Sequence, residues 1–119
     1  MAWNFSQDRP VYLQISERII LSIINGKYTP AQQIPSVRQL ALEAAVNPNT
    51  IQHAFSELEN EGIIISKGTQ GRFVTSDSAI IEKCRKKLAK QLVENFLYKA
   101  SELSVTKDEI ITILEEAQL

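Results

Sequence analysis

The chain has 119 residues, of which 44% are hydrophobic and 23% are charged, and its formal net charge is −1. This composition supports a hydrophobic core and excludes a disordered chain, and the length suits one domain, or a small domain with an appendage. A net charge near zero gives by itself no indication of a nucleic-acid partner. Residues 1–76 carry six Lys and Arg against six Asp and Glu, so a DNA-binding surface there must concentrate few basic side chains.

Several functional classes are disfavoured by what the sequence lacks. Cys84 is the only cysteine, so no intramolecular disulfide forms and a reducing compartment fits. Residues 1–10 lack the basic start and apolar run of a signal peptide, and no apolar stretch approaches the roughly 20 residues that span a bilayer. No nucleophile–base pair, metal cluster or phosphate loop is recognisable. We therefore expect a cytoplasmic protein that is no enzyme, has no membrane partner and needs no metal or cofactor.

The first predicted element is a helix over residues 10–25. Pro10 suits a first turn, and Gly26 is a natural C-terminal stop. Apolar side chains recur at helical spacing at Tyr12, Ile15, Ile19 and Ile23. Residues 27–35 contain two prolines and predict a connector, in which Ile34 could anchor a very short strand.

Two further helices are predicted from their start signals. Ser36 is a suitable N-cap for a helix of about two turns. Asn47 is the next N-cap, and Pro48 at the first helical position strengthens that start, with Gly62 as the stop. Two helices joined by so short a turn form a helix-turn-helix.

A hairpin and two more helices complete the predicted fold. The β-branched residues 63–66, the Gly-containing turn KGTQGR and the residues 73–75 predict a β-hairpin, so the chain is mainly α with a winged helix-turn-helix domain over residues 1–76. Residues 75–78 are polar and predict a hinge. Residues 77–119 form the second segment, with a long amphipathic helix at 79–99 and a last helix opened by Ser104 or Thr106.

The C-terminal segment is expected to serve dimerisation. Two amphipathic helices cannot close a core alone, so they must pack on the first domain or on another chain. The apolar stripe of the long helix consists of Ile81, Cys84, Leu88, Leu92 and Phe96. On that stripe, Cys84 is better explained as a buried structural thiol than as a redox sensor.

Five motifs in residues 10–75 occur together in one family of bacterial proteins. They are P-V-Y-x-Q-I at 10–15, I-P-S-V-R-Q-L-A at 34–41, V-N-P-N-T-I at 46–51, A-F-x-x-L-E-x-E-G at 54–62 and G-R-F-V at 71–74. On these residues the chain resembles the GntR family of transcription regulators. The Asn-Pro-Asn-Thr joint and short C-terminal segment resemble its YtrA subfamily, which implies two dimerising C-terminal helices and no large effector-binding domain. Ala31 stands where many relatives carry glycine, and Gln52 where many carry a basic residue.

The resemblance implies that the helix from Pro48 enters the major groove with its N-terminal residues at the base edges. Asn and Gln can pair with adenine, and Thr can contact a base or a phosphate, while free N–H groups at a helix start can bind a phosphate. Arg38 is the expected cationic reader, with a surface salt bridge as the alternative. The wing would contact the sugar-phosphate backbone or minor groove, unless it is an ordinary solvated hairpin. The expected DNA-contacting residues are Ser36, Arg38, Asn47, Asn49, Thr50, Gln52, His53, Lys67, Gly71 and Arg72.

Some residues keep two interpretations at this stage. His53 either contacts a phosphate or is a solvated or helix-bonded histidine, and the basic residues 83–90 either form a solvated face or lie near DNA. The carboxylates of Glu57, Glu59 and Glu61 repel phosphate, so that end of the helix should point away from DNA. Trp3 and Phe5 should form an arm that packs on a domain surface or a partner subunit.

The predicted function is a homodimeric repressor that occupies a two-fold symmetric operator in double-stranded DNA. The subfamily resemblance implies control of neighbouring, transporter-type genes; a small-molecule effector is not identified. The alternative is a winged helix that serves as a protein–protein interaction module, which the low charge supports and the polar helix tip opposes. Charge placement discriminates the two, because Arg38, Lys67 and Arg72 should converge with the Asn49 end of the helix only in a DNA-binding protein.

Overall fold

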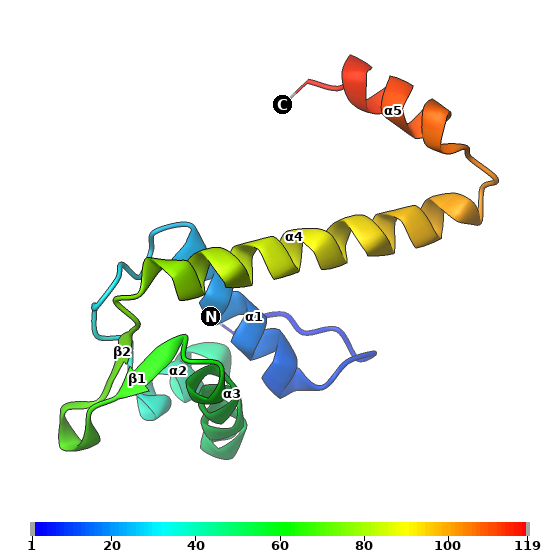
Figure 1. Cartoon of the computed structure of the whole chain (residues 1–119). Helices are drawn as coiled ribbons and strands as arrows, with labels where there is room; N and C mark the ends of the chain where they lie inside the picture. The colour runs from blue at the N-terminus through cyan, green and yellow to red at the C-terminus, as the bar shows by residue number, and fades with distance from the viewer. Residues whose placement is uncertain (1, 119) are drawn as a thin grey trace. The chain divides into compact units, whose positions relative to one another are not determined.

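The computed structural model describes residues 2–118, and the chain forms two compact units, Met1–Cys84 and Arg85–Leu119. The elements in chain order are α1 (Val11–Ile24), α2 (Val37–Ala44), α3 (Pro48–Asn60), β1 (Ile64–Ser66), a 3₁₀ turn (Gly68–Gln70), β2 (Arg72–Val74), α4 (Ser78–Ser101) and α5 (Lys107–Glu116) (Figure 1). The predicted mainly α fold with a small hairpin is confirmed. Across the described residues, no helix combines the length and apolar character needed to cross a membrane.

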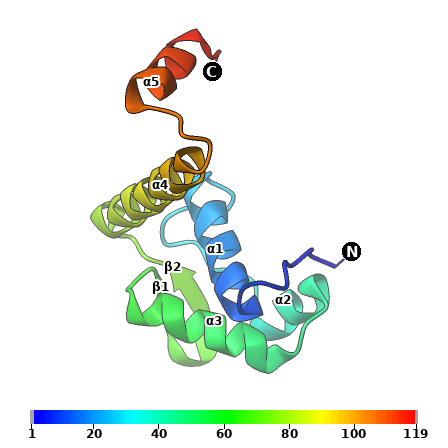
Figure 2. The ribbon, with the colours of Figure 1, turned by 90° about the vertical axis from the view of Figure 1, so that its right-hand side faces the viewer.

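The first unit is built around one hydrophobic core. Both α1 and α2 pack on α3, with α3 running beneath α1 (Figure 2). The largest fully buried side chains are Phe55, Ile15, Ile19, Leu40, Ile51, Leu58, Ile64 and Val74. The apolar stripe predicted for α1 and the buried face of α3 supply most of this set. The exposed face of α3 is therefore held in place from behind by a close-packed core.

The two helix starts that were predicted from N-cap residues are confirmed. At α2, Ser36 Oγ accepts a hydrogen bond from the Gln39 N–H, while the Gln39 side chain accepts from the Ser36 N–H, which is a capping box. At α3, Asn47 Oδ1 accepts from the Asn49 N–H at 2.8 Å, and Pro48 occupies the first helical position. Both caps fix where the polar residues after them emerge.

Two alanines in the first unit adopt left-handed backbone conformations. Ala31 in the connector has φ +64°, and Ala45 in the turn between α2 and α3 has φ +58°. This conformation costs an L-residue with a Cβ about 1 kcal/mol or more, which explains why glycine suits position 31.

We expect Ala31→Gly and Ala45→Gly each to raise the free energy of unfolding by roughly 0.5–1 kcal/mol, because glycine removes the left-handed penalty. Urea denaturation of each variant measures this change. The matched control is Ala41→Gly, which removes the same methyl group from the interior of α2 and should lower stability by about 1 kcal/mol. A loss of stability in the position-31 and position-45 variants would contradict the expectation.

The hairpin is confirmed with adjusted boundaries. β1 and β2 pair antiparallel with Ile64 opposite Val74 and Ser66 opposite Arg72. Arg72 therefore belongs to the second strand and not to the turn, and Ile63 lies before the first strand. The connector runs along the other edge of β2, because the Ile34 N–H donates to the Arg72 carbonyl and the Val74 N–H donates to the Gln32 carbonyl. The short strand expected around Ile34 is a single bridge, formed by Gln33 with Phe73.

The segment 75–78, expected to be a hinge, is a hydrogen-bonded capping turn. Thr75 is buried, its N–H donates to the Ile63 carbonyl, and its Oγ1 accepts from the Asp77 N–H. Asp77 Oδ1 in turn accepts from the Ala79 N–H at the start of α4. Polar composition suggested a hinge, but these polar groups satisfy the backbone where the chain turns into α4.

The N-terminal arm packs on the surface of α1, one of the two expected positions. The Arg18 guanidinium lies 4.2 Å from the centroid of the Trp3 ring, and Trp3 and Phe5 form a tilted aromatic pair. Arg9 adds an ion pair to Glu17 on the same helix. The arm is thus attached by cation–π and charge interactions rather than by core burial.

In the second unit, α5 begins at Thr106, whose side chain forms a capping box with Glu109. Only Ala100 and Ile110 are buried among the residues of this unit that the structure describes. Large apolar side chains remain exposed at Leu92, Val93, Phe96, Leu97, Ile111, Ile113 and Leu114. On the predicted α4 stripe, Ile81, Cys84 and Leu88 are half-buried, so the thiol of Cys84 is partly accessible rather than fully buried.

Candidate nucleic-acid interface

The ten predicted DNA-contacting residues are accessible on the first unit. Seven are exposed, and Thr50, Gly71 and Arg72 are half-buried. They come from the start of α2, the start of α3 and the wing, which here means residues 64–74. These three segments surround the exposed N-terminal half of α3.

Two of the predicted cationic residues meet at one cavity. Arg38 and Arg72 both line a cavity of about 260 Å³, together with Ser36 at the start of α2 and Gly71 in the wing. Arg38 is exposed, and it has no hydrogen bond or ion pair with any other residue in the range 2–118. A guanidinium without protein partners retains all five N–H donors for a ligand.

Arg72 connects the wing to the outer face of α3. Its Nε donates to Glu59 Oε1 at 2.6 Å, and its Nη2 donates to Gln52 Oε1 at 3.3 Å. The guanidinium carbon also lies 4.9 Å from the centroid of the buried Phe55 ring. Glu59, which was expected to point away from the surface that binds DNA, therefore directly contacts one of its predicted residues.

The contact with Arg72 orients the amide of Gln52. A guanidinium can only donate hydrogen bonds, so the carbonyl oxygen of Gln52 faces Arg72 and its NH₂ group is free to face outward. Gln52 and Asn49 lie three positions apart and thus on one face of the α3 N-terminal half. This face offers amide donors to base acceptors such as adenine N7 without adding charge.

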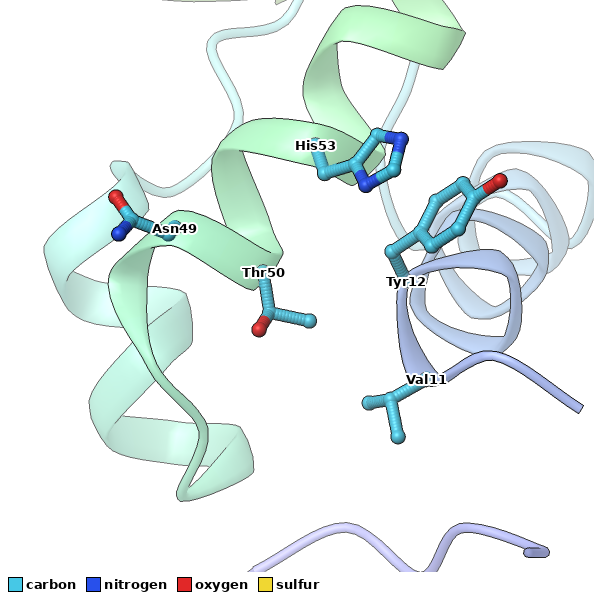
Figure 3. A pocket seen from close by; sticks show the side chains of 5 residues that line it. All are labelled: Val11, Tyr12, Asn49, Thr50 and His53. Atoms are coloured by element: carbon cyan, nitrogen blue, oxygen red, sulfur yellow. The ribbon is translucent and has the colours of Figure 1, made fainter.

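His53 stacks on an aromatic ring, which neither of its two predicted environments included. The rings of His53 and Tyr12 lie 3.5 Å apart between centroids with an interplanar angle of 9°. The two rings face each other beside a surface depression also lined by Val11, Asn49 and Thr50, with Thr50 pointing toward Val11 (Figure 3). Tyr12 thereby ties the start of α1 to the start of α3 and restricts the rotamer of His53.

The wing turn is held by the connector. Gln33 Nε2 donates to the Gln70 carbonyl at 2.8 Å, and a Cβ added at Gly71, whose φ is +102°, would lie 2.7 Å from that same nitrogen. Gly71 is thus favoured by its own backbone conformation, and a Cβ there would also displace the Gln33 amide. Lys67 at the other side of the turn lies 4.6 Å from the centroid of the Phe73 ring.

Gly71→Ala is expected to lower the free energy of unfolding by about 1–3 kcal/mol, because alanine is strained in this backbone conformation and displaces the Gln33 amide. Thermal and urea unfolding measure the loss. Gly68→Ala is the matched control, since Gly68 has φ +60° but open space around its Cβ position. An equal loss in both variants would show that the Gln33 contact contributes nothing.

Sequence reasoning missed three contributors to this surface. Tyr12 was assigned only to the apolar stripe of α1, Gln33 only to a connector, and Glu59 only to the acidic end of α3. The position of Tyr12 in the first turn of its helix was the one available signal, because a phenol there can be both packed and exposed. Nothing in the local sequence indicated the other two.

A tight turn between α2 and α3, followed by a wing whose arginine contacts α3, defines a winged helix-turn-helix DNA-binding protein. Among the described residues, no cluster of three or more His, Cys, Asp or Glu side chains could hold a metal ion. The chain belongs to the gntR family of bacterial regulatory proteins, whose family model matches residues 11–74. The resemblance seen in the five sequence motifs is confirmed.

Two curated relatives come from Bacillus subtilis (strain 168). The HTH-type transcriptional regulator YhcF is 36% identical over 108 residues, covering 91% of this chain and 89% of YhcF. The HTH-type transcriptional repressor YtrA is 36% identical over 69 residues, covering 58% of this chain and 53% of YtrA.

Two solved structures are also similar. A GntR family transcriptional regulator from Listeria monocytogenes superimposes with a TM-score of 0.87 at 38% identity, covering 96% of this chain and 100% of that one. The DNA-binding domain of AraR, solved in complex with operator ORX1, superimposes with a TM-score of 0.56 at 32% identity, covering 63% and 92%. The chain is therefore a transcriptional regulator with a DNA-binding domain.

Proposed function

We propose that this chain is a homodimeric repressor of the YtrA-like type that binds a two-fold symmetric operator through the first unit. The observation that supports the proposal is that two arginines lie at one cavity beside α3. Arg38 and Arg72 line this cavity, and Arg72 contacts Gln52 on α3. Two of the six basic residues in 1–76 thus lie near an amide suited to reading bases.

Each segment has a distinct role in this proposal. Asn49 and Gln52 read base edges in the major groove, and Arg38 reaches a guanine or a phosphate. The N–H groups at the starts of α2 and α3, near Ser36 and Asn47, bind phosphates. Thr50 and His53 contact the DNA backbone beside them, with His53 oriented by Tyr12.

The wing contacts DNA beside α3 in this proposal. Lys67 lies on the exposed side of the turn and contacts the sugar-phosphate backbone. Gly71 and Arg72 lie on the side that faces α3, so they reach DNA only where the wing and α3 approach it together. AraR, whose DNA-binding domain was solved with an operator, supports DNA binding by the first unit.

The second unit serves dimerisation in this proposal. Leu92 is 71% exposed and Phe96 is 49% exposed, and both lie on the α4 stripe. Exposed apolar patches of this kind mark interaction surfaces, and closed two-fold dimers are the commonest assembly of soluble proteins. A second copy of the chain would bury this stripe against its equivalent and place two α3 helices on one duplex.

We further propose that the protein acts in the cytoplasm, has no catalytic activity and controls neighbouring transporter-type genes. The YtrA relationship supports repression, and the resemblance to that subfamily implies the transporter-type genes. The residues 83–90 form a solvated basic face in this proposal. The alternative of a protein–protein interaction module is less well supported, because Arg38 and Arg72 line one cavity beside the polar face of α3.

Fluorescence anisotropy tests the proposal. Duplexes enriched by the wild-type protein from a random library are compared with shuffled duplexes of the same composition, at several salt concentrations. A specificity ratio of about a thousandfold or more, with log affinity falling linearly in log salt, is the expected result. Equal binding of both duplexes, or no enriched sequence, would contradict an operator-binding function.

A further inference from the structure

We propose that Glu59 is a positioning residue that sets DNA specificity through Arg72. The inference rests on the proposed function in one respect, namely that Gln52 reads a base. It adds that the discrimination of Gln52 depends on a carboxylate that itself contacts no DNA. Glu59, Arg72 and Gln52 form a continuous chain of carboxylate, guanidinium and amide.

Arg72 is held firmly on α3. Its short, charge-assisted bond to Glu59 is reinforced by the Phe55 ring beneath the guanidinium. The side chains of Arg72 and Glu59 are only 27% and 32% exposed. Partial burial reduces solvent screening, so this pair is stronger than an ordinary surface ion pair.

The carboxylate of Glu59 offsets the positive charge of Arg72. While Glu59 neutralises Arg72, the wing arginine offers little net charge to a phosphate. A free guanidinium beside the groove would bind any DNA sequence, since phosphate contacts carry no sequence information. Glu59 therefore suppresses binding to wrong sequences at this position.

Arg72 also determines the orientation of the Gln52 amide. Arg72 donates to the carbonyl oxygen of Gln52 and so determines which end of that amide faces outward. If Glu59 releases Arg72, the Gln52 amide is free to rotate and can present either donor or acceptor to a base pair. Discrimination at the base pair that Gln52 reads should then weaken.

The decisive experiment compares Glu59→Gln with the wild-type protein on the selected and shuffled duplexes. We expect the variant to bind the shuffled duplex about three- to tenfold more tightly, with a salt slope steeper by about 0.9 for one added phosphate contact. The specificity ratio should fall about five- to tenfold, near the low end of what one base-reading side chain contributes. Glu59→Asp, which keeps the carboxylate, should retain more of the ratio than Glu59→Gln.

The matched control is Glu57→Gln, which removes the same charge from the same helix. Glu57 has no ion pair within residues 2–118, so this variant reports the general electrostatic effect alone. Repeating Glu59→Gln in an Arg72→Gln background isolates the route, because Glu59 then has no guanidinium to position. Unfolding midpoints of all variants identify any that fail to fold, and Glu59→Asp serves as the readout in that case.

Three outcomes overturn the inference. Equal specificity ratios in Glu59→Gln and Glu57→Gln would reduce Glu59 to a general charge. If Glu59→Gln lowers the specificity ratio as much in the Arg72→Gln background as in the wild-type protein, Glu59 does not act through Arg72. If the wild-type protein itself lacks specific binding, the proposed function fails first, and this inference fails with it.

Discussion

Leu92→Arg is expected to convert the protein from a dimer into a monomer at micromolar concentration. Leu92 is 71% exposed in the single chain, so its replacement leaves the fold of each unit intact. In a dimer, the same position would bury an apolar side chain worth about 1.5–3 kcal/mol, and arginine would instead bury an unpaired charge from each copy. Sedimentation velocity measures the change directly.

Loss of the dimer should also weaken operator binding by about a hundredfold or more, because two linked recognition surfaces gain avidity of about 10²–10⁴ over one. The control is Glu94→Arg, which introduces the same side chain at an exposed position on the opposite face of α4. That variant should remain dimeric. A dimeric Leu92→Arg protein would exclude this stripe as the subunit interface, and a monomeric wild-type protein would exclude the dimer altogether.

Arg38→Ala is expected to reduce operator affinity by about five- to 150-fold for each recognition surface. An arginine that contacts guanine contributes about 1–3 kcal/mol, and Arg38 has no protein partner within the described residues that would hold it back. The free energy of unfolding of the Arg38→Ala variant should equal that of the wild-type protein, because the substitution removes no hydrogen bond or ion pair within the described residues. Anisotropy on selected and shuffled duplexes separates two modes of contact.

If Arg38 reads a base, the specificity ratio falls and the salt slope changes little. If it binds a phosphate, both duplexes lose affinity together and the slope becomes shallower by about one. Arg9→Ala is the control, since Arg9 is a surface arginine that is paired with Glu17 on α1. Wild-type affinity in Arg38→Ala would remove Arg38 from the interface.

Features that depend on neighbouring residues in the sequence were predictable, whereas features that depend on distant residues were not. Ser36 and Asn47 act as N-caps where the sequence predicted them, and Thr106 is the cap of the two predicted candidates, because a cap depends only on residues two or three positions away. The hairpin boundaries shifted by about one residue, since strand ends depend on the partner strand and on the connector beside it. Residues 75–78 were assigned by composition, which does not distinguish a hinge from a capping turn.

The side-chain contacts of the candidate site could not be predicted in the same way. The Tyr12–His53 stack and the Arg72–Glu59 pair each join two different elements. Periodicity identifies the face of a helix that is exposed but not which residue of another element lies across from it. The residue types at the surface were therefore predictable, whereas the direction in which Gln52 and Arg72 point was not.

The sheet of the wing has a consequence for aggregation. β2 is covered on both edges, by β1 on one side and by the connector on the other. The open edge belongs to β1, which has three residues and is followed at once by Lys67. Short strands and edge lysines are devices that prevent strand-to-strand association between molecules. The wing can therefore present backbone and charge to a nucleic acid while offering no template for β-sheet growth, even when many copies crowd on the same chromosome.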